Sequence, residues 1–309
     1  MHVKILGSGA GGGFPQWNCA CQNCRAQRAG TFSGKPRTQL QVALSADGQS
    51  WVLLNASPDI RFQINQTPEL YPGGGNRGTP ISSVVLTSAE LDQILGLLVL
   101  REFQPFRVYA TRSVLKILRE DNSLFAALNR VSDQVSWIEI AAGGIFSIQG
   151  SASGSGALHF RPVSVEPHFP TYVSEKRCSE LCEHEATLGL IVEDDLNERL
   201  AYFPSIPRID DSLLKQLASA KVILVDGTFW SDDELIQVRG EGPTARQIGH
   251  VPMSGEDGSL QQLRGLAAEK KIFVHINNTN PVLNESSDEF RQVREAGWEV
   301  AEDGWGLTL

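Results

Sequence analysis

The sequence predicts a four-layer αβ/βα sandwich, in which two mixed β-sheets pack face to face and helices cover their outer sides. The first observation behind this is a weak repeat between the two halves of the chain. Each half has a strand that ends in an aspartate-bearing turn, at Asp59 and at Asp226, and then a strand that ends in a polar cluster, at 88–93 and at 275–278. The second observation is that no linker with a shift in composition interrupts the 309 residues. We therefore expect a single domain over 1–309.

Strands dominate the first half of the chain. A hairpin is expected around Asp47-Gly48, a helix start at Ser57-Pro58-Asp59, and a helix capped by Thr111 that runs to Glu120. The Gly- and Pro-rich residues 71–80 predict a surface loop. The strands expected in this half cover 2–6, 41–44, 51–55, 81–86, 107–110, 137–140, 145–148 and 158–165.

Strands and helices alternate in the second half. A hairpin is expected from 187–192 and 199–203, with Asp194, Asp195 and Asn197 in its turn. The helices expected after it cover 211–218, 261–269 and 287–296, and the strands cover 222–225, 272–274, 298–301 and 305–309.

Gly7-Ser-Gly-Ala-Gly-Gly-Gly13 follows the first strand and contains the spacing G-x-G-x-x-G. A dinucleotide site would need a helix directly after it, but Phe14-Pro15 comes instead. We therefore interpret this segment as a loop whose backbone passes close to another part of the chain, where only glycine fits.

Composition excludes several classes of function. Hydrophobic residues make up 41% of the chain and the net charge is −9 without a basic block, which is typical of a globular protein that binds neither nucleic acid nor an anionic membrane. No apolar run is long enough to span a bilayer, and no secretory signal precedes the first strand, so we expect a cytoplasmic protein. Five cysteines, an odd number, do not predict a disulfide framework.

Cys19-x-Cys21-x-x-Cys24 is the most specific chemical signal in the chain. Three thiols this close in a reducing compartment can hold a tetrahedral zinc, which would order an N-terminal loop at about 17–26. The fourth ligand is not local, and the candidates are a histidine or the side chain of Asn278.

Other residues of metal-binding type are spread along the chain. Cys178, Cys182 and His184 form a second cluster, for which surface thiols are at least as good an interpretation. His168, His250 and His275 each lie at a strand end or in a Gly/Pro turn. Any one of them alone is more often structural, but together with Asp92 and Asp226 they favour a shared metal site.

A family resemblance rests on longer motifs. Residues 86–97, Leu-Thr-Ser-Ala-Glu-Leu-Asp-Gln-Ile-Leu-Gly-Leu, resemble the metallo-β-lactamase-fold signature Thr-His-x-His-x-Asp-His-x-x-Gly-Leu. Thr87, Asp92, Gly96 and Leu97 match it, and non-histidine residues stand at the histidine positions 88, 90 and 93. Within that superfamily the chain resembles the pyrroloquinoline quinone (PQQ) biosynthesis protein B family, on the motifs Gly11–Cys24, Asn55–Arg61, Gly96–Glu102, Leu224–Trp230 and His275–Pro281.

This resemblance implies the sandwich fold, a structural zinc at the three cysteines and a role in making the redox cofactor PQQ in bacteria. It also implies iron-dependent oxygenation of the tyrosine ring of a precursor derived from a cross-linked Glu–Tyr fragment. The expected partners are that small-molecule or peptide-derived precursor and other PQQ biosynthesis proteins, and a homodimer is left open. The iron ligands implied are Asp92, a histidine at the next position, and His275.

The chain departs from that pattern at Gln93, because an amide oxygen is a weak ligand for Fe(II). Glu90, His168 or His250 could supply the missing ligand, and Asp226 would orient a ligand or water. The absent histidines argue against the two-zinc hydrolase chemistry of ordinary members. We therefore favour an iron-dependent hydroxylase. The alternative is a non-catalytic carrier that helps move PQQ or its precursor to the periplasm, and a one-metal hydrolase is less favoured.

Overall fold

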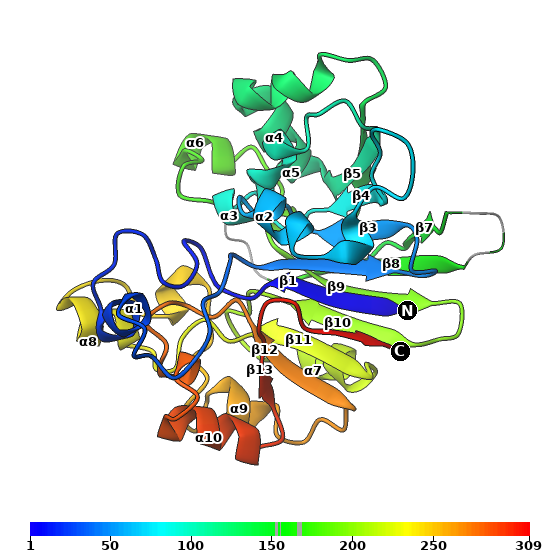
Figure 1. Cartoon of the computed structure of the whole chain (residues 1–309). Coiled ribbons are helices and arrows are strands. Elements are labelled where there is room, and N and C mark those ends of the chain that lie inside the picture. Colours follow the sequence, from blue (N-terminus) through cyan, green and yellow to red (C-terminus); the bar gives the residue numbers. More distant parts are fainter. Residues whose placement is uncertain (152–153, 155, 166–168) are drawn as a thin grey trace. The chain divides into compact units, whose positions relative to one another are not determined.

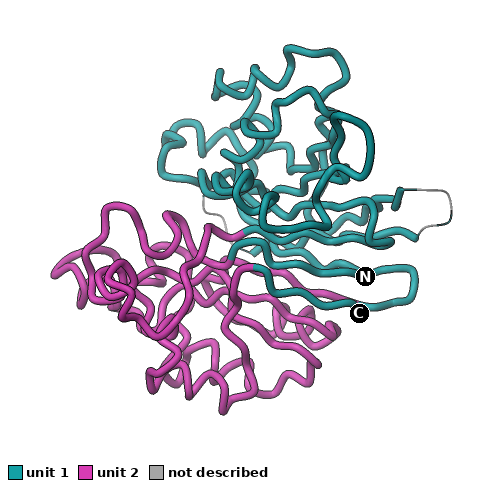
Figure 2. Tube along the Cα trace, in the orientation of Figure 1, with its two compact units in different colours: residues 1–7, 41–198, 304–309 teal, residues 8–40, 199–303 magenta. Residues whose placement is uncertain are grey.

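The computed structural model describes residues 1–151, 154, 156–165 and 169–309. The chain folds as two units, each assembled from segments that are far apart in the sequence (Figure 2). Unit 1 contains residues 1–7, 41–198 and 304–309, and unit 2 contains residues 8–40 and 199–303. The two units alternate along the chain, and the predicted single domain over 1–309 stays a prediction.

Unit 1 is built on a mixed sheet with the strand order β14-β1-β2-β3-β4-β5-β6 (Figure 1). Its antiparallel part pairs β14 with β1, β1 with β2, and β2 with β3, and its parallel part runs from β3 to β6. The strands are β1 (His2–Gly7), β2 (Gln41–Ser45), β3 (Trp51–Leu54), β4 (Ile81–Val85), β5 (Phe106–Thr111), β6 (Val135–Ile140) and β14 (Gly306–Thr308).

Helical crossovers connect the parallel strands of unit 1, as parallel pairing requires. They bury apolar side chains of the sheet, among them the fully buried Leu53, Val84 and Val108, against the partly buried Ile64 of α2 and Val99 of α4. The helices are α2 (Ile60–Asn65), η1 (Pro68–Leu70), α3 (Leu91–Ile94), α4 (Gly96–Val99), α5 (Arg112–Lys116), the π-helical η2 (Ile117–Asp121) and η3 (Ser123–Asn129).

The rest of unit 1 is an antiparallel run in which β7 pairs with β8 and β8 with β9. Two short helices precede β9. The elements are β7 (Phe146–Gln149), β8 (Ala157–Ser164), α6 (Glu175–Cys178), η4 (Glu183–Glu185) and β9 (Leu188–Asp194).

Unit 2 is built on four parallel strands in the order β10-β11-β12-β13. The strands are β10 (Arg199–Phe203), β11 (Val222–Asp226), β12 (Lys270–Val274) and β13 (Glu299–Val300). The helices are α1 (Gln22–Arg28), α7 (Asp211–Ala218), α8 (Glu234–Arg239), η5 (Arg246–Ile248), α9 (Ser259–Gln262), η6 (Pro281–Leu283) and α10 (Asp288–Glu295). Because β11 and β12 are parallel with Asp226 opposite Val274, Asp226 and His275 leave adjacent strands at the same sheet edge.

Most predicted elements are confirmed within a few residues, and the differences have local causes. The helix predicted over 261–269 is wrong, because α9 ends at Gln262 and only turns lead from there to Gly265. The helix after Thr111 ends at Lys116 and continues as a π-helix to Asp121. The cap of α2 is Asp59 rather than Ser57, whose hydroxyl accepts a hydrogen bond from the Asp59 N–H at 3.1 Å.

The glycine-rich segment is the close-approach loop predicted from the sequence. Gly13 has φ +66°, and a Cβ there would lie 2.9 Å from the carbonyl oxygen of Arg37. The loop continues into turns rather than a helix, so no dinucleotide-binding helix follows it. In the described part of the chain, no helix combines the length and apolar character needed to cross a membrane.

Candidate metal centres

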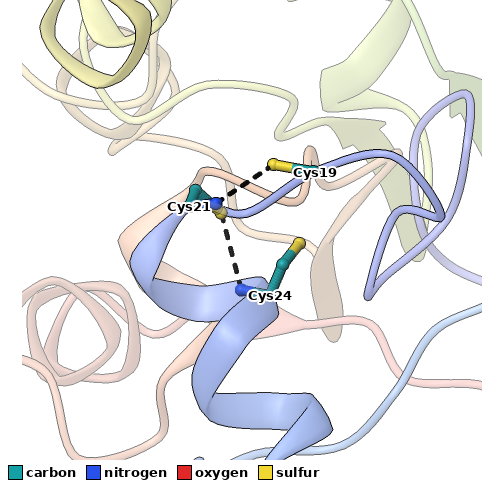
Figure 3. A group of neighbouring side chains, drawn as sticks. All are labelled: Cys19, Cys21 and Cys24. Carbon is teal, nitrogen blue, oxygen red and sulfur yellow. Dashed lines mark hydrogen bonds between the residues drawn. The ribbon is translucent and has the colours of Figure 1, made fainter.

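The three N-terminal cysteines converge at the start of α1 in unit 2. Figure 3 shows Cys24 on the first turn of α1, Cys21 where that helix begins and Cys19 on the loop before it. The Cys21 thiol caps the helix, accepting from the Cys24 N–H at 3.5 Å, and the Cys21 N–H donates to the Cys19 sulfur at 3.4 Å. The three sulfurs lie within 4.8 Å of one another. Thiolates around a tetrahedral zinc are roughly 3.8 Å apart, so the cluster needs only a small contraction to hold the ion.

Asn278 lies where a fourth ligand would be needed. Its Nδ2 is 3.1 Å from the sulfur of Cys19, 3.6 Å from that of Cys21 and 3.4 Å from that of Cys24. Its Oδ1 is buried and has no hydrogen-bond partner among the described residues. Because the two ends of an amide are assigned rather than observed, turning the amide over would direct Oδ1 at all three sulfurs. The donor set therefore fits a Cys3Asn zinc site, and Asn278 as the fourth ligand stays a prediction.

The environment of the thiols differs across the cluster. Burial raises the pKa of Cys24 to about 11. Burial would also raise the pKa of Cys19, but hydrogen bonds with Cys21, Cys24 and Asn278 outweigh it and lower that pKa. Zinc binds thiolates, so loading the site near neutral pH would release protons, chiefly from Cys24.

Glu234 supports the segment that carries Asn278. Its carboxylate accepts hydrogen bonds from the Trp230 N–H at 2.6 Å and from the hydroxyl of Thr279, the residue after Asn278. Burial raises the pKa of Glu234 to about 7, although these hydrogen bonds act in the opposite direction. The sequence analysis missed this residue, because nothing in its local pattern distinguishes it from a surface glutamate.

A second cluster in unit 2 brings together Asp226, His250 and His275, whose ligand atoms lie within 4.8 Å of one another. Asp226 ends β11, His275 follows β12 with φ +60°, and His250 follows the left-handed Gly249 after η5. The sequence analysis proposed all three for a shared metal site, and the structure places them together. The ring centroids of the two histidines are 5.4 Å apart.

Hydrogen bonds assign the tautomers of both histidines. The Thr228 hydroxyl donates to Oδ1 of Asp226 at 2.6 Å, so Nδ1 of His275, 2.8 Å from that hydroxyl, must donate to it. Nδ1 of His250 lies 2.7 Å from Oδ2 of Asp226, where it donates to the carboxylate. With Nδ1 held in this way, Nε2 is the atom through which each ring would bind a metal, which is the usual arrangement of metal-binding histidines.

Asp226 is saturated as an acceptor in this arrangement. Its Oδ1 also accepts from the Thr228 N–H at 3.0 Å, and its Oδ2 from the Ile206 N–H at 2.9 Å. Burial would raise its pKa, but the charge and hydrogen bond of His250, together with His275 and Thr228, hold the pKa below its ordinary value. Asp226 therefore holds the His250 ring directly and the His275 ring through Thr228, and the expectation that it orients a ligand or water stays a prediction. Thr228 was missed, although the turn Asp226-Gly-Thr228 was noted as polar.

The signature segment of unit 1 forms a closed network instead. Gln93 is buried, and its Oε1 accepts from the hydroxyls of Thr87 and Ser88, both at 2.9 Å. The Asn55 side chain accepts from the Thr87 N–H at 2.8 Å and joins the same network. The Gln93 oxygen is therefore occupied by protein donors.

The remaining predicted residues are more dispersed. Glu90 is exposed at the start of α3, and Asp92 lies half-buried in its first turn. His168 falls outside the described residues. Within the described part of unit 1, no three His, Cys, Asp or Glu side chains gather at metal-binding distances, which includes the predicted cluster of Cys178, Cys182 and His184.

Comparisons with known proteins agree with this architecture. The family model of the β-lactamase superfamily domain matches residues 50–276. Coenzyme PQQ synthesis protein B of Methylobacterium sp. (strain 4-46) is 42% identical over 309 residues, and that of Xanthomonas oryzae pv. oryzae (strain MAFF 311018) is 41% identical over 312 residues, each with both chains fully covered.

Solved structures extend the comparison. The crystal structure of Zn²⁺-bound PqqB from Methylobacterium extorquens matches with a TM-score of 0.91 at 41% identity, covering all of both chains. A diphosphatase of the PhnP family matches with a TM-score of 0.67 at 20% identity, over 100% of this chain and 97% of that one, and shows the fold alone. The predicted metallo-β-lactamase-like sandwich with two mixed sheets and outer helices is thereby confirmed.

The fourth zinc ligand can be tested with Asn278→Ala. We expect zinc affinity to fall at least about tenfold, because one of four donors is lost. Competition with a chelator measures it, and Asn18→Ala removes an exposed amide beside the same loop as the control. Equal affinity in all three proteins would remove Asn278 from the site.

The tautomer assignment can be tested with Thr228→Val, which keeps the shape of the side chain and removes its hydroxyl. We expect the metal affinity of the histidine cluster to fall by about 10- to 100-fold, because the His275 ring loses its anchor. Thr228→Ser, which keeps the hydroxyl, should bind metal as the parent does. Isothermal titration of Fe(II) under anaerobic conditions gives the affinities, and an unchanged value for Thr228→Val would contradict the assignment.

The raised pKa of Glu234 predicts that the free energy of unfolding depends on pH. Its pKa is about 7 in the folded chain against an ordinary 4.5, so the folded state holds the proton more tightly. The contribution is complete below pH 4.5 and is lost as pH rises through 7, a loss of up to about 3 kcal/mol. Urea unfolding at pH 5 and pH 8 should show this loss in the parent and in the exposed-site control Glu241→Gln, but not in Glu234→Gln. If Glu234→Gln lost as much stability between pH 5 and pH 8 as the parent, the loss would not come from Glu234.

Proposed function

Because this chain belongs to the coenzyme PQQ synthesis protein B family of the β-lactamase superfamily and acts in PQQ synthesis, we propose that it is an iron-dependent hydroxylase of the tyrosine ring of a Glu–Tyr-derived precursor. The observation that carries the proposal is the pair of imidazoles in unit 2. Each of them is held through Nδ1, so that Nε2 is the atom that it would offer to a metal.

The donor set favours iron chemistry over hydrolysis. Two imidazoles and one carboxylate are the ligand types of non-haem Fe(II) oxygenases. His250 and His275 would hold the ion, and when bound it would supply the activation of dioxygen. Asp92, predicted from the sequence as the carboxylate ligand, stays a prediction because it belongs to unit 1. Gln93 has its oxygen committed to Thr87 and Ser88, so we assign it no ligand role.

The protein's own groups have separate tasks in this proposal. Asp226 accepts a hydrogen bond from His250 Nδ1 and so keeps that ring oriented, with Nε2 as the atom that would bind the metal. The Thr228 hydroxyl donates a hydrogen bond to Asp226 and accepts one from Nδ1 of His275, so it orients the His275 ring in the same way. The three cysteines with Asn278 would hold a structural zinc that orders the segment 17–26 within unit 2.

An oxygen-incorporation experiment tests the proposal. The purified chain is loaded anaerobically with Fe(II), mixed with a cross-linked Glu–Tyr precursor and ascorbate, and exposed to ¹⁸O₂. Ascorbate supplies the two electrons that reduce the second oxygen atom to water. Mass spectrometry of the product should show label from dioxygen. His250→Ala and His275→Ala should each lower the rate by at least about 100-fold, whereas His184→Ala, outside the cluster, should leave it unchanged.

The alternative function predicts the opposite outcome. A carrier would bind PQQ or its precursor tightly, bind no iron and incorporate no label. That combination would reject the hydroxylase. In a parallel reaction with unlabelled O₂ in H₂¹⁸O, label in the product would point to a hydrolase.

A further inference from the structure

A cavity in unit 1 joins two sequence motifs that the proposed function leaves unused. Residues 55–61 end at Arg61 on α2, and residues 96–102 end at Arg101 and Glu102 after α4. Both ends line one cavity of about 390 Å³, together with the starts of β4 and β5. This volume lies within the range of small-molecule sites, about 300–1,000 Å³.

The floor of the cavity is apolar. Ile81 and Phe106 are buried at the starts of their strands, and Ile64, Val99 and Leu100 are half-buried and pack against the core of unit 1. These five side chains come from four separate elements, so the core itself fixes their positions. A ligand that covers an apolar surface of this kind removes it from water, which favours binding.

The turn after α4 positions the polar side chains at the edge of the cavity, which we call its rim. Phe103 has φ +65°, and its N–H bonds back to the carbonyl of Arg101 at 2.9 Å. The chain therefore reverses at this point, and residues on both sides of the turn, from Val99 to Glu102 and then Gln104 and Phe106, reach the same cavity.

The rim carries an excess of positive charge. Arg101 donates to the carbonyl of Leu98 at 2.8 Å and lies 3.7 Å from Glu102, an exposed and loose ion pair. Arg61 is exposed, and among the described residues it forms no hydrogen bond or ion pair. In a chain with a net charge of −9, an unpaired guanidinium above an apolar floor is a site for an anion.

We propose that this cavity binds a small amphipathic acid, with its aliphatic or aromatic body on Ile64, Val99 and Phe106 and its carboxylate at Arg61. Arg101 adds a second donor after loosening from Glu102. The site lies wholly in unit 1 and does not depend on the metal centres or on the proposed hydroxylation.

Octanoate and 1-octanol, two probes with the same chain and different head groups, test this on the full-length protein. Isothermal titration calorimetry should give one saturable site for octanoate, with weaker binding of 1-octanol. Arg61→Gln should weaken octanoate about fivefold and leave 1-octanol unchanged, because only the charged contact is lost. Arg130→Gln, an exposed arginine elsewhere in unit 1, is the matched control.

A second variant tests the floor. Val99→Phe places extra volume in the cavity and should weaken both probes at least fivefold, with thermal unfolding as the check of its fold. If that variant does not fold, Arg61→Gln still tests the proposal, since the Arg61 side chain is exposed. Octanoate binding that is non-saturable, insensitive to Arg61→Gln or no tighter than that of 1-octanol overturns the proposal. Binding of a leucine-ending acidic peptide through Arg61 without octanoate binding would overturn it too.

Discussion

The buried carboxylate of Asp226 is the interaction on which the chemistry of unit 2 depends. Four donors reach its two oxygens: the N–H groups of Ile206 and Thr228, the Thr228 hydroxyl and Nδ1 of His250. A buried charge is costly unless hydrogen bonds satisfy it, so these contacts stabilise the ionised form and each other. The same contacts fix which ring nitrogen of each histidine carries the proton. One buried charge thus orders the two imidazoles at this sheet edge, as the proposed metal centre requires.

The polar turn at 86–97 shows how the same topological position can take another role. It follows a buried parallel strand, as Asp226 does, but Thr87, Ser88 and Gln93 satisfy one another. With both hydroxyls donating to one amide oxygen, the turn is closed by internal hydrogen bonds. In the superfamily signature, positions 88 and 93 of this segment carry histidines. The network therefore gives a physical account of how the chain fills that space without them.

How far the sequence predicted the molecule depended on whether the signal was local. The spacing of Cys19, Cys21 and Cys24 predicted their cluster because a loop and one helical turn set it. Asp226 and His275 were predicted from strand ends, since parallel pairing brings such ends together. Thr228 and Glu234 were missed because their roles come from partners distant in sequence. Helix α1 was missed as well, because its cap is a cysteine thiol rather than one of the usual capping groups.

The link between the cysteines and Asn278 has a consequence for how the protein is made. Cys24 and Asn278 are 254 positions apart, so the three cysteines leave the ribosome long before Asn278 is synthesised. Until then the thiols can be oxidised or bind another soft metal such as Cu(I). A zinc ion held by the three cysteines and Asn278 would therefore reach its full set of ligands only near the completion of translation, and the N-terminal loop would be ordered late.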